Sequence, residues 1–332
     1  MRLLLISDTH GTLGLIDELA DRVRAEAVIH AGDFGFFDDG SPERLSDREL
    51  RLQVTHSDIP STEKTRMGQL PRDQLIEQVR NHRLLGEFQS YLEGRKSFHV
   101  PVYAVWGNHE DKSVVEKLCR RNTTVANLHI LHHRQGYRLG TAFVYGLGGN
   151  LLPGSKMMQS PVAGGGGKIW STLSQYCDLV ETAGVELAGM DGPPTGLRIF
   201  VSHLSPGKEP FVEFIGARTR ADLTVSGHMG APNTMVWNPF AVRSPEEAER
   251  RIRDGLETVR QACLIATANA QWVEKAFTLI GQIPEDTVNI GRREKAASWY
   301  RRMTHINLPD ADAGYAVIDV GEDYCTLKTF VS

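Results

Sequence analysis

The feature that most constrains this chain is a set of short apolar runs, each of which stops abruptly at polar residues. RLLLISD (residues 2–8) opens the chain, a helical pattern follows over residues 14–26, and AVIHAGD (residues 27–33) repeats the first pattern. Apolar runs of this length between polar clusters are typical of buried strands. The strand–helix–strand order predicts parallel pairing and therefore an α/β layered fold.

Further strands and helices are predicted along the chain. Strands are expected within residues 98–108, 197–203 and 221–228, and helices over residues 111–121 and 168–188. The alternating stretch of residues 129–149 predicts an antiparallel hairpin that turns at Gln135–Gly136. The last stretch, residues 315–330, predicts a terminal hairpin that turns at residues 321–323.

Three stretches interrupt this pattern. Residues 38–97 and 240–303 are polar and charged with helical spacing, so we expect one domain over residues 1–332 that carries two helical insertions. The first insertion is placed to stand over the carboxyl ends of the strands. The stretch LPGSKMMQSPVAGGGGK (residues 152–168) is interpreted as a mobile loop. It is not a P-loop, because Val162 stands where that motif needs its first glycine.

Composition narrows the classes of protein. The 332 residues are 41% hydrophobic with a net charge of −4, which argues against bulk, non-specific nucleic-acid binding. No apolar run is long enough to cross a membrane, and no signal peptide is recognised. The cysteines form no CxxC pair and are interpreted as buried free thiols, so we expect a cytoplasmic protein. They are Cys119, Cys177, Cys263 and Cys325.

Five of the expected strands end in side chains that bind metal ions. In open α/β sheets the ligand site lies at the carboxyl ends of the strands, so these residues are expected to converge. Alone, each fragment could equally be a turn or the capped start of a helix. The residues are Asp8 and His10, then Asp33, then Asn108, His109 and Glu110, then His203, and last His228.

The types of ligand indicate which ions would bind. Carboxylate, imidazole and amide oxygen together suit Mn²⁺, Fe or Zn²⁺ better than Ca²⁺. Two cations about 3.5–4 Å apart need a shared carboxylate, and Asp33, central in the series, is the natural bridge. We expect two divalent ions, with Mn²⁺ as the first choice and Fe or Zn²⁺ as alternatives.

The ordered series D-x-H, G-D, G-N-H-[DE], a lone H and G-H resembles the calcineurin-like metallophosphoesterase superfamily over residues 1 to about 230. The resemblance implies a four-layer α/β/β/α sandwich of two mixed sheets, with the metals at one end. It also implies a metal-dependent phosphoester hydrolase in which a hydroxide held between the metals attacks phosphorus. His109 would contact the phosphate and protonate the leaving group.

The resemblance assigns the ligands to two metal sites. Asp8, His10 and Asp33 would hold the first metal, and Asp33, Asn108, His203 and His228 the second. The family motif ends G-H-x-H, but Gly230 stands at its second histidine. We therefore expect a weak first site, in which water, substrate or Asn233 replaces the missing imidazole.

Several other polar residues are assigned roles outside the set of metal ligands. Glu110 is expected to hydrogen-bond to neighbours of the metals, and His30 to be a hydrogen-bonded core histidine. His129, His132 and His133 are interpreted as surface or edge residues. Two basic segments could contact nucleic acid, although such segments are more often solvated helix faces. One is GRREKAASWYRRM (residues 291–303), and the other comprises Arg66, Arg72, Arg80, His82 and Arg83.

The expected substrate is a phosphate ester, and the protein partners are unknown. GDFGFF lacks the arginine that follows Gly-Asp in the Ser/Thr phosphoprotein phosphatases. GDF and GNHE are also similar to RNA lariat-debranching enzymes, whose first motif carries Cys where this chain has Asp8. A diester needs less cationic clamping than a monoester dianion, which favours a phosphodiesterase acting on a nucleotide or nucleic acid. The alternatives are a Ser/Thr-type phosphomonoesterase and a weakly active nucleotide- or phosphate-binding module.

Overall fold

The first predicted strands lie side by side and parallel. In the computed structural model, β1 (Arg2–Ile6) pairs with β2 (Ala27–His30), and β2 pairs with β3 (Val102–Ala104). Helix α1 (Gly14–Val23) connects β1 to β2. The structure describes residues 1–188, 196–228, 235–237, 245–282, 303–321 and 325–331.

The first sheet has six strands in the order β14-β13-β1-β2-β3-β4. Strand β4 (Leu128–Ile130) extends the parallel set, and β13 (Gly314–Val320) pairs antiparallel with β1. β13 and β14 (Cys325–Val331) pair antiparallel with each other, so the two strands of the predicted terminal hairpin are confirmed.

The second sheet also has six strands, in the order β11-β12-β10-β9-β6-β5. Its centre is the parallel set of β6, β9, β10 and β12, and both edge strands run antiparallel. The strands are β5 (Tyr137–Leu139), β6 (Ala142–Leu147), β9 (Arg198–Ser202), β10 (Leu223–Ser226), β11 (Met235–Trp237) and β12 (Thr304–Asn307). Both sheets are therefore mixed.

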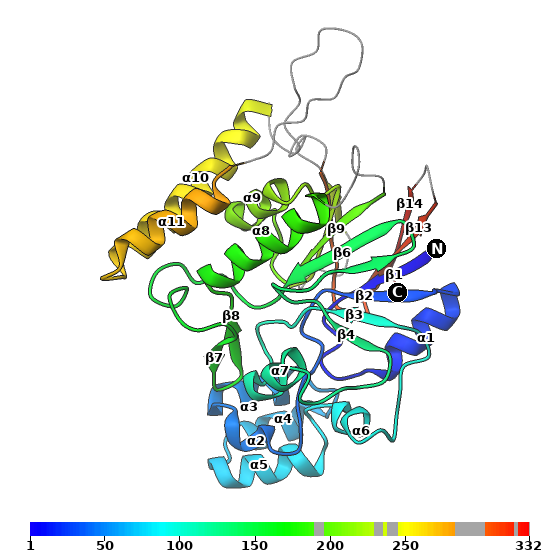
Figure 1. Ribbon diagram of the computed structural model, residues 1–332. Coiled ribbons are helices and arrows are strands. Elements are labelled where there is room, and N and C mark those ends of the chain that lie inside the picture. Colours follow the sequence, from blue (N-terminus) through cyan, green and yellow to red (C-terminus); the bar gives the residue numbers. More distant parts are fainter. Residues whose placement is uncertain (189–195, 229–234, 238–244, 283–302, 322–324, 332) are drawn as a thin grey trace, which may run out of the picture.

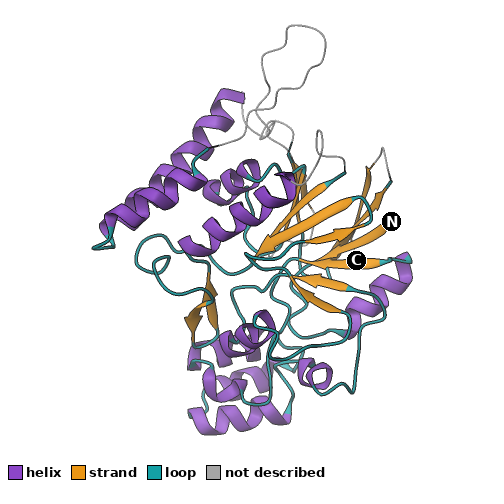
Figure 2. Cartoon of the chain, viewed as in Figure 1, coloured by secondary structure: helices purple, strands orange, loops and turns teal. Residues whose placement is uncertain are grey.

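Alternation along the strands creates two apolar layers. On β1, Leu3 and Leu5 face a core that also holds Ile199 and Val225 of the second sheet, whereas Leu4 packs among helix residues. Helix α1 and α7 (Lys112–Cys119) cover the outer side of the first sheet, and α8 (Leu173–Ala188) and α9 (Pro210–Arg218) that of the second. The predicted α/β/β/α sandwich is confirmed (Figure 1, Figure 2).

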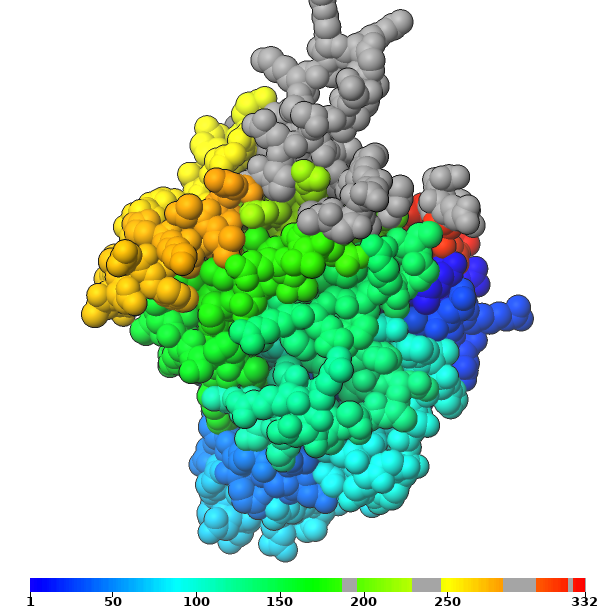
Figure 3. Space-filling view, in the orientation of Figure 1, coloured from blue at the N-terminus to red at the C-terminus, as the bar shows by residue number. Residues whose placement is uncertain are grey.

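Residues 38–97 carry five helices with a small apolar core of their own. That core includes Phe37, Leu50, Val54 and Leu75, all buried. The helices form one end of the molecular surface, coloured blue to cyan in Figure 3. They are α2 (Ser41–Arg44), α3 (Asp47–His56), α4 (Ser61–Gly68), α5 (Arg72–Asn81) and α6 (Phe88–Leu92).

A second helical block packs over α8 and α9. It comprises α10 (Pro245–Ile265) and α11 (Ala270–Ile280). Arg218 of α9 donates a hydrogen bond to the Leu279 carbonyl of α11 at 3.2 Å. The basic segment predicted at residues 291–303 lies, except for Met303, outside the described residues. In the described part of the chain no helix is long and apolar enough to cross a membrane.

Three expectations about the fold and the cysteines are wrong. The hairpin predicted over residues 129–149 does not turn at Gln135–Gly136, because β4 and β5 belong to different sheets and the chain crosses between them. The hairpin is instead β5–β6, which turns at Gly140–Thr141. Alternation is the same in both arrangements, so it could not distinguish them.

The glycine-rich stretch at residues 152–168 is the second correction. It ends in an antiparallel hairpin of β7 (Ala163–Gly165) and β8 (Lys168–Trp170), where a mobile loop was expected. The Ser46 amide at the start of α3 donates to the Gly166 carbonyl at 2.9 Å. The hairpin is therefore anchored to the helical insertion.

The third correction concerns the thiols. All four cysteines are free, as predicted, but only Cys263 is fully buried and Cys325 is exposed.

Candidate metal centre

The strand ends of both sheets meet at one place. The ligand atoms of Asp8, His10 and Asp33 lie within 4.8 Å of one another, and so do those of Asp33, His203 and His228. Asp33 belongs to both groups. The structure thus brings together the residues that the sequence predicted, with the carboxylate predicted to be the bridge between the two groups.

His203 is held in an orientation that suits a metal ligand. It is fully buried, and its Nδ1 lies 2.9 Å from the Ala31 carbonyl oxygen, which can only accept a hydrogen bond. When neutral, as a metal ligand must be, His203 therefore carries its proton on Nδ1. Its Nε2 lone pair faces Asn108 Oδ1 at 2.8 Å and Asp33 Oδ2 at 3.6 Å. Three acceptors that converge without a donor are the chemistry of a cation site.

The other group is built around the Asp8 carboxylate. The Asp8 carboxylate is buried and accepts hydrogen bonds from the Ser7 hydroxyl at 2.5 Å and the His228 amide at 3.1 Å. His10 Nε2 lies 3.9 Å from Asp8 Oδ1, and the His10 side chain is 32% exposed. Each group therefore has one partly exposed imidazole, His10 in this group and His228 in the group around His203.

Four predicted ligands have a left-handed backbone. The φ angles are 54° at Asp8, 45° at His10, 48° at Asp33 and 57° at His228. Such angles are uncommon for residues other than glycine and cluster at functional sites. Close packing adds a further constraint, because a Cβ at Gly107 would lie 1.8 Å from Asp33 Oδ1. The glycine of GNHE therefore leaves room for the shared carboxylate.

The charges of the site also fit bound cations. Within the described residues, Asp8 and Asp33 are buried without a lysine or arginine partner. Burial opposes ionisation of Asp33, but His203, His10 and His109 outweigh it and lower the pKa of Asp33 to about 2. For Asp8 burial dominates and raises the pKa of the carboxyl. Two divalent ions would supply the missing positive charge.

The backbone of His109 contacts the ligand Asp33, but its ring nitrogen Nδ1 faces Glu49 of the helical insertion. Its amide donates to Asp33 Oδ1 at 3.0 Å, and its Nδ1 lies 2.7 Å from Glu49 Oε2. Burial lowers the pKa of His109, but the hydrogen bond to Glu49 and the charge of Asp33 outweigh it and hold the pKa above its ordinary value. The arrangement favours a protonated imidazole with Nε2 free to donate.

The sequence reasoning missed Glu49. It lies on α3 of the helical insertion, and its side chain is 1% exposed. The signal was present as Ser46-x-x-Glu49, the pattern of a helix capping box. Only half of the box forms: the Ser46 hydroxyl accepts from the Glu49 amide at 3.3 Å, while the Glu49 carboxylate bonds to His109.

Comparison with known proteins gives the family. The model of the calcineurin-like phosphoesterases matches residues 1–232, about two thirds of the chain. The chain belongs to the calcineurin-like phosphoesterase family. A search of curated proteins found no match. One crystal structure aligns over 99% of this chain and 98% of its own with 10% sequence identity and a TM-score of 0.47, a likeness on which nothing further rests.

Family membership makes this phosphoesterase a metal-dependent hydrolase of phosphate esters. The candidate ligand groups of the structure agree with that dependence on divalent metal ions. The residue roles remain predictions. Gly230 and Asn233, on which the expected weakness of the first site rests, lie outside the described residues.

Glu110 of this phosphoesterase bonds to the loop that carries Asp33, as the sequence predicted. Its buried carboxylate accepts from the amides of Phe34 at 2.7 Å, Gly35 at 3.2 Å and Phe36 at 2.6 Å. Burial and the charge of Asp33 raise the pKa of Glu110 to about 8, against the effect of these donors. Glu110 therefore shapes the Asp33 loop, and it belongs to neither of the two candidate ligand groups.

The remaining histidines divide between core and edge. His30 is fully buried and bonds to the Thr9 hydroxyl at 3.0 Å, which confirms the core prediction. His129 lies on edge strand β4, as expected. His133 is only 8% exposed, so its assignment to the surface is wrong; its Nε2 lies 3.6 Å from the Asp178 carboxylate.

Proposed function

We propose that this phosphoesterase is a phosphodiesterase that hydrolyses a nucleotide or nucleic-acid ester at the Asp33 centre. Asp8, His10 and Asp33 would hold one divalent cation, and Asp33, Asn108, His203 and His228 the other, with Mn²⁺ as the first choice. The convergence of these ligand atoms within 4.8 Å in each group supports the assignment.

The observation that carries the choice of a diester is the residue pattern after Asp33. Phe37 stands where the Ser/Thr phosphoprotein phosphatases have their arginine, and it is buried. The rings of Phe34 and Phe36 stack at 4.5 Å in the core. This loop therefore packs inward and supplies no guanidinium to clamp a monoester dianion, whereas a diester with one charge needs less.

The two cations, when bound, would neutralise the phosphate oxygens and lower the pKa of an attacking water. Side chains of the protein would supply the proton transfer and the positioning. His109 Nε2 would donate a proton to the leaving alkoxide, which is general acid catalysis. Glu49 would act as a positioning residue, because its bond to Nδ1 sets the ring orientation and favours the charged ring. Lys168 of β8 lies 3.5 Å from the second Glu49 oxygen and holds that carboxylate in turn.

The anchored hairpin also supports the second ligand group. The Ile169 amide of β8 donates to the Asn108 carbonyl at 3.2 Å, on the residue before His109. Ser46 and Gly166 connect the same hairpin to α3, which carries Glu49. The hairpin thus couples the general acid, its positioning carboxylate and Asn108.

Hydrolysis of bis-p-nitrophenyl phosphate and p-nitrophenyl phosphate by the metal-loaded protein tests this proposal. With Mn²⁺ added and metals counted by mass spectrometry, we expect two ions per chain and a higher kcat/KM for the diester. Preference for the monoester would refute the diesterase assignment. Bound metal with turnover of neither substrate would favour the nucleotide-binding module.

A further inference from the structure

A cavity of about 510 Å³ opens directly beside the candidate metal centre. His10 lines it from the sandwich, and Gln53, His56, Asp58 and Arg83 line it from the helical insertion. The rings of His10 and His56 lie 6.2 Å apart. Cavities of this size hold nucleotide-sized molecules, so a substrate whose phosphorus lies at the metals has space here for the rest of the molecule.

Arg83 differs from the other four residues of the basic segment predicted in this insertion. Arg66 pairs with Glu63, Arg72 pairs with Asp47, and Arg80 Nη2 lies 2.6 Å from Glu43. His82 Nε2 lies 3.7 Å from Glu63. Within the described residues, the Arg83 guanidinium has neither a hydrogen bond nor an ion pair, and the side chain is exposed. It is therefore free to bind an anion in the cavity.

The turn that carries Arg83 is fixed against the metal-binding loop. A Cβ at Gly86 would lie 2.5 Å from Gly11 Cα, so the two backbones touch where only glycines fit. The Glu87 amide donates to the Gly11 carbonyl at 3.2 Å, and the Glu87 carboxylate accepts from the Gly14 amide at 2.7 Å. These backbone contacts fix the turn that carries Arg83 relative to the loop that carries His10, and they do not depend on a ligand.

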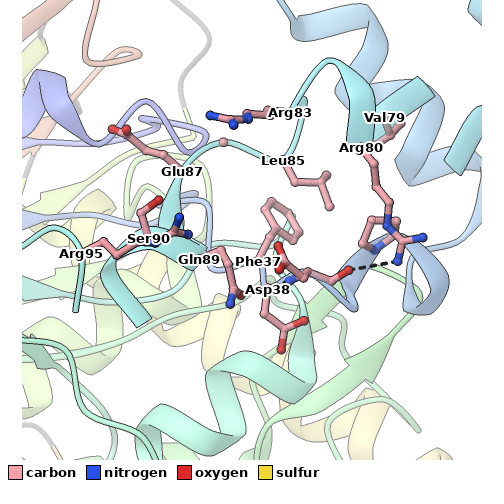
Figure 4. Close-up of a pocket in the computed structure, with 13 residues that line it drawn as sticks. Phe37, Asp38, Val79, Arg80, Arg83, Leu85, Glu87, Gln89, Ser90 and Arg95 are labelled. Carbon is pink, nitrogen blue, oxygen red and sulfur yellow. Dashed lines mark hydrogen bonds between the residues drawn. The ribbon is translucent and has the colours of Figure 1, made fainter. Parts of the chain in front are cut away.

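Arg83 and Gly86 of the same turn also line a second cavity, of about 470 Å³, which is drawn in Figure 4. In the second cavity three carboxylates, those of Asp38, Asp39 and Glu87, offset three arginines, whereas the cavity beside His10 has one carboxylate, Asp58. Arg80 of the second cavity already donates to the Asp39 carbonyl at 3.1 Å, the bond drawn as a dashed line in Figure 4. An anion at Arg83 is therefore expected on the side of His10.

The other polar groups that line the cavity beside His10 indicate which hydrogen-bonding groups a ligand would carry besides an anion. His56 lies on α3 with its ring facing that of His10, and an imidazole can form hydrogen bonds with a ligand. Gln53 lies one helical turn away on α3. Asp58 is the one carboxylate among the lining residues and can accept from sugar hydroxyls or base amines.

We propose that this cavity is a subsite for a second phosphate group of the substrate, bound by Arg83, with the nucleoside contacted by Gln53, His56 and Asp58. The inference rests on the proposed function and names its substrate class: nucleotides that carry another phosphate besides the scissile one. Arg83 is here a specificity-determining residue, and a guanidinium is the side chain best suited to a phosphate.

Inhibition of bis-p-nitrophenyl phosphate hydrolysis by two nucleotides tests the subsite. Adenosine 3′,5′-bisphosphate should inhibit the wild-type protein about tenfold or more tightly than adenosine 5′-monophosphate. Arg83→Gln should remove that preference and leave the kcat/KM of the small diester unchanged, while Arg83→Lys should keep part of it. Arg24→Gln is the matched control, since Arg24 is exposed with a φ of 55° against 52° for Arg83 and lies at the opposite end of β1.

A wild-type protein without the preference, or an Arg83→Gln variant that retains it, would overturn the subsite. Failure of the proposed function gives a different result, namely no hydrolysis of the small diester. In that case calorimetric titration of the same two nucleotides into the Mn²⁺-loaded protein measures the preference directly. Circular dichroism of each variant checks that it is folded.

Discussion

The two halves of the candidate metal centre differ in how far each is organised by the protein itself. In the half around His203, that imidazole is fully buried and the Ala31 carbonyl sets its tautomer, while His228 is partly exposed. The half around Asp8 ends in His10, which is 32% exposed and lines the neighbouring cavity. A buried, hydrogen-bonded ligand is preorganised for the metal, whereas an exposed one can also meet the substrate. We therefore interpret the half around Asp8 and His10, whose exposed imidazole lines the cavity, as the one that faces the substrate.

Removing the residue common to both halves should have the largest effect. Asp33→Asn takes away the shared negative charge, so both ions should be lost together. Loss of a residue that only supports a metal ligand lowers metal affinity or activity about 10–100-fold. Loss of the bridging carboxylate should exceed this and bring the rate of diester hydrolysis near background. Metal counting and kcat/KM would check it, with the exposed Asp73→Asn as control. Retention of one tight ion would show that the halves are independent.

Substitutions at the general acid should rank next. His109→Ala should lower kcat by about 10²–10⁴-fold, the range for general acid catalysis. Glu49→Gln should lower it less. Because Glu49 raises the pKa of His109 and the protonated ring is the active form, activity falls as the pH rises through that pKa. Glu49→Gln should therefore shift the alkaline limb of the pH–rate profile to lower pH, and an unmoved limb would contradict the positioning role.

The stability of the metal-free protein should separate the two halves. His203→Ala leaves the buried Ala31 carbonyl without its partner, which should reduce the free energy of unfolding by about 1–3 kcal/mol. His10→Ala removes a partly exposed side chain and should change it by about 0.5 kcal/mol or less. Urea unfolding in the presence of a chelator measures both values. Equal losses would mean that the halves are organised alike.

The smallest effect is expected at Gly230. If the missing imidazole weakens the first site, Gly230→His should tighten the binding of that ion and leave the second ion unchanged. Titration with Mn²⁺ after removal of metals would compare the two affinities. An unchanged affinity would show that another group already fills the position.

The sequence by itself determined the parallel strands and the order of the candidate ligands. Each run such as RLLLISD or AVIHAGD ends in its polar residue, and parallel strands bring their carboxyl ends to one edge, so the convergence of Asp8 and Asp33 follows from local pattern and topology. The sandwich of two sheets, which adds His203, was implied only by the resemblance to a known family. The left-handed backbone at the ligands leaves no such trace, because it is imposed by the surrounding packing.

Only the tertiary structure decided what the helical insertion and the glycine-rich hairpin do. Glu49 is 60 residues from His109, and Arg83 is 73 residues from His10, so neither pair has a periodicity that the sequence could show. The contacts depend on close backbone approach, Gly86 on Gly11 and the Gly166 hairpin on Ser46. Such approaches are set by how two elements dock, and docking is a property of the packed surfaces rather than of either segment alone.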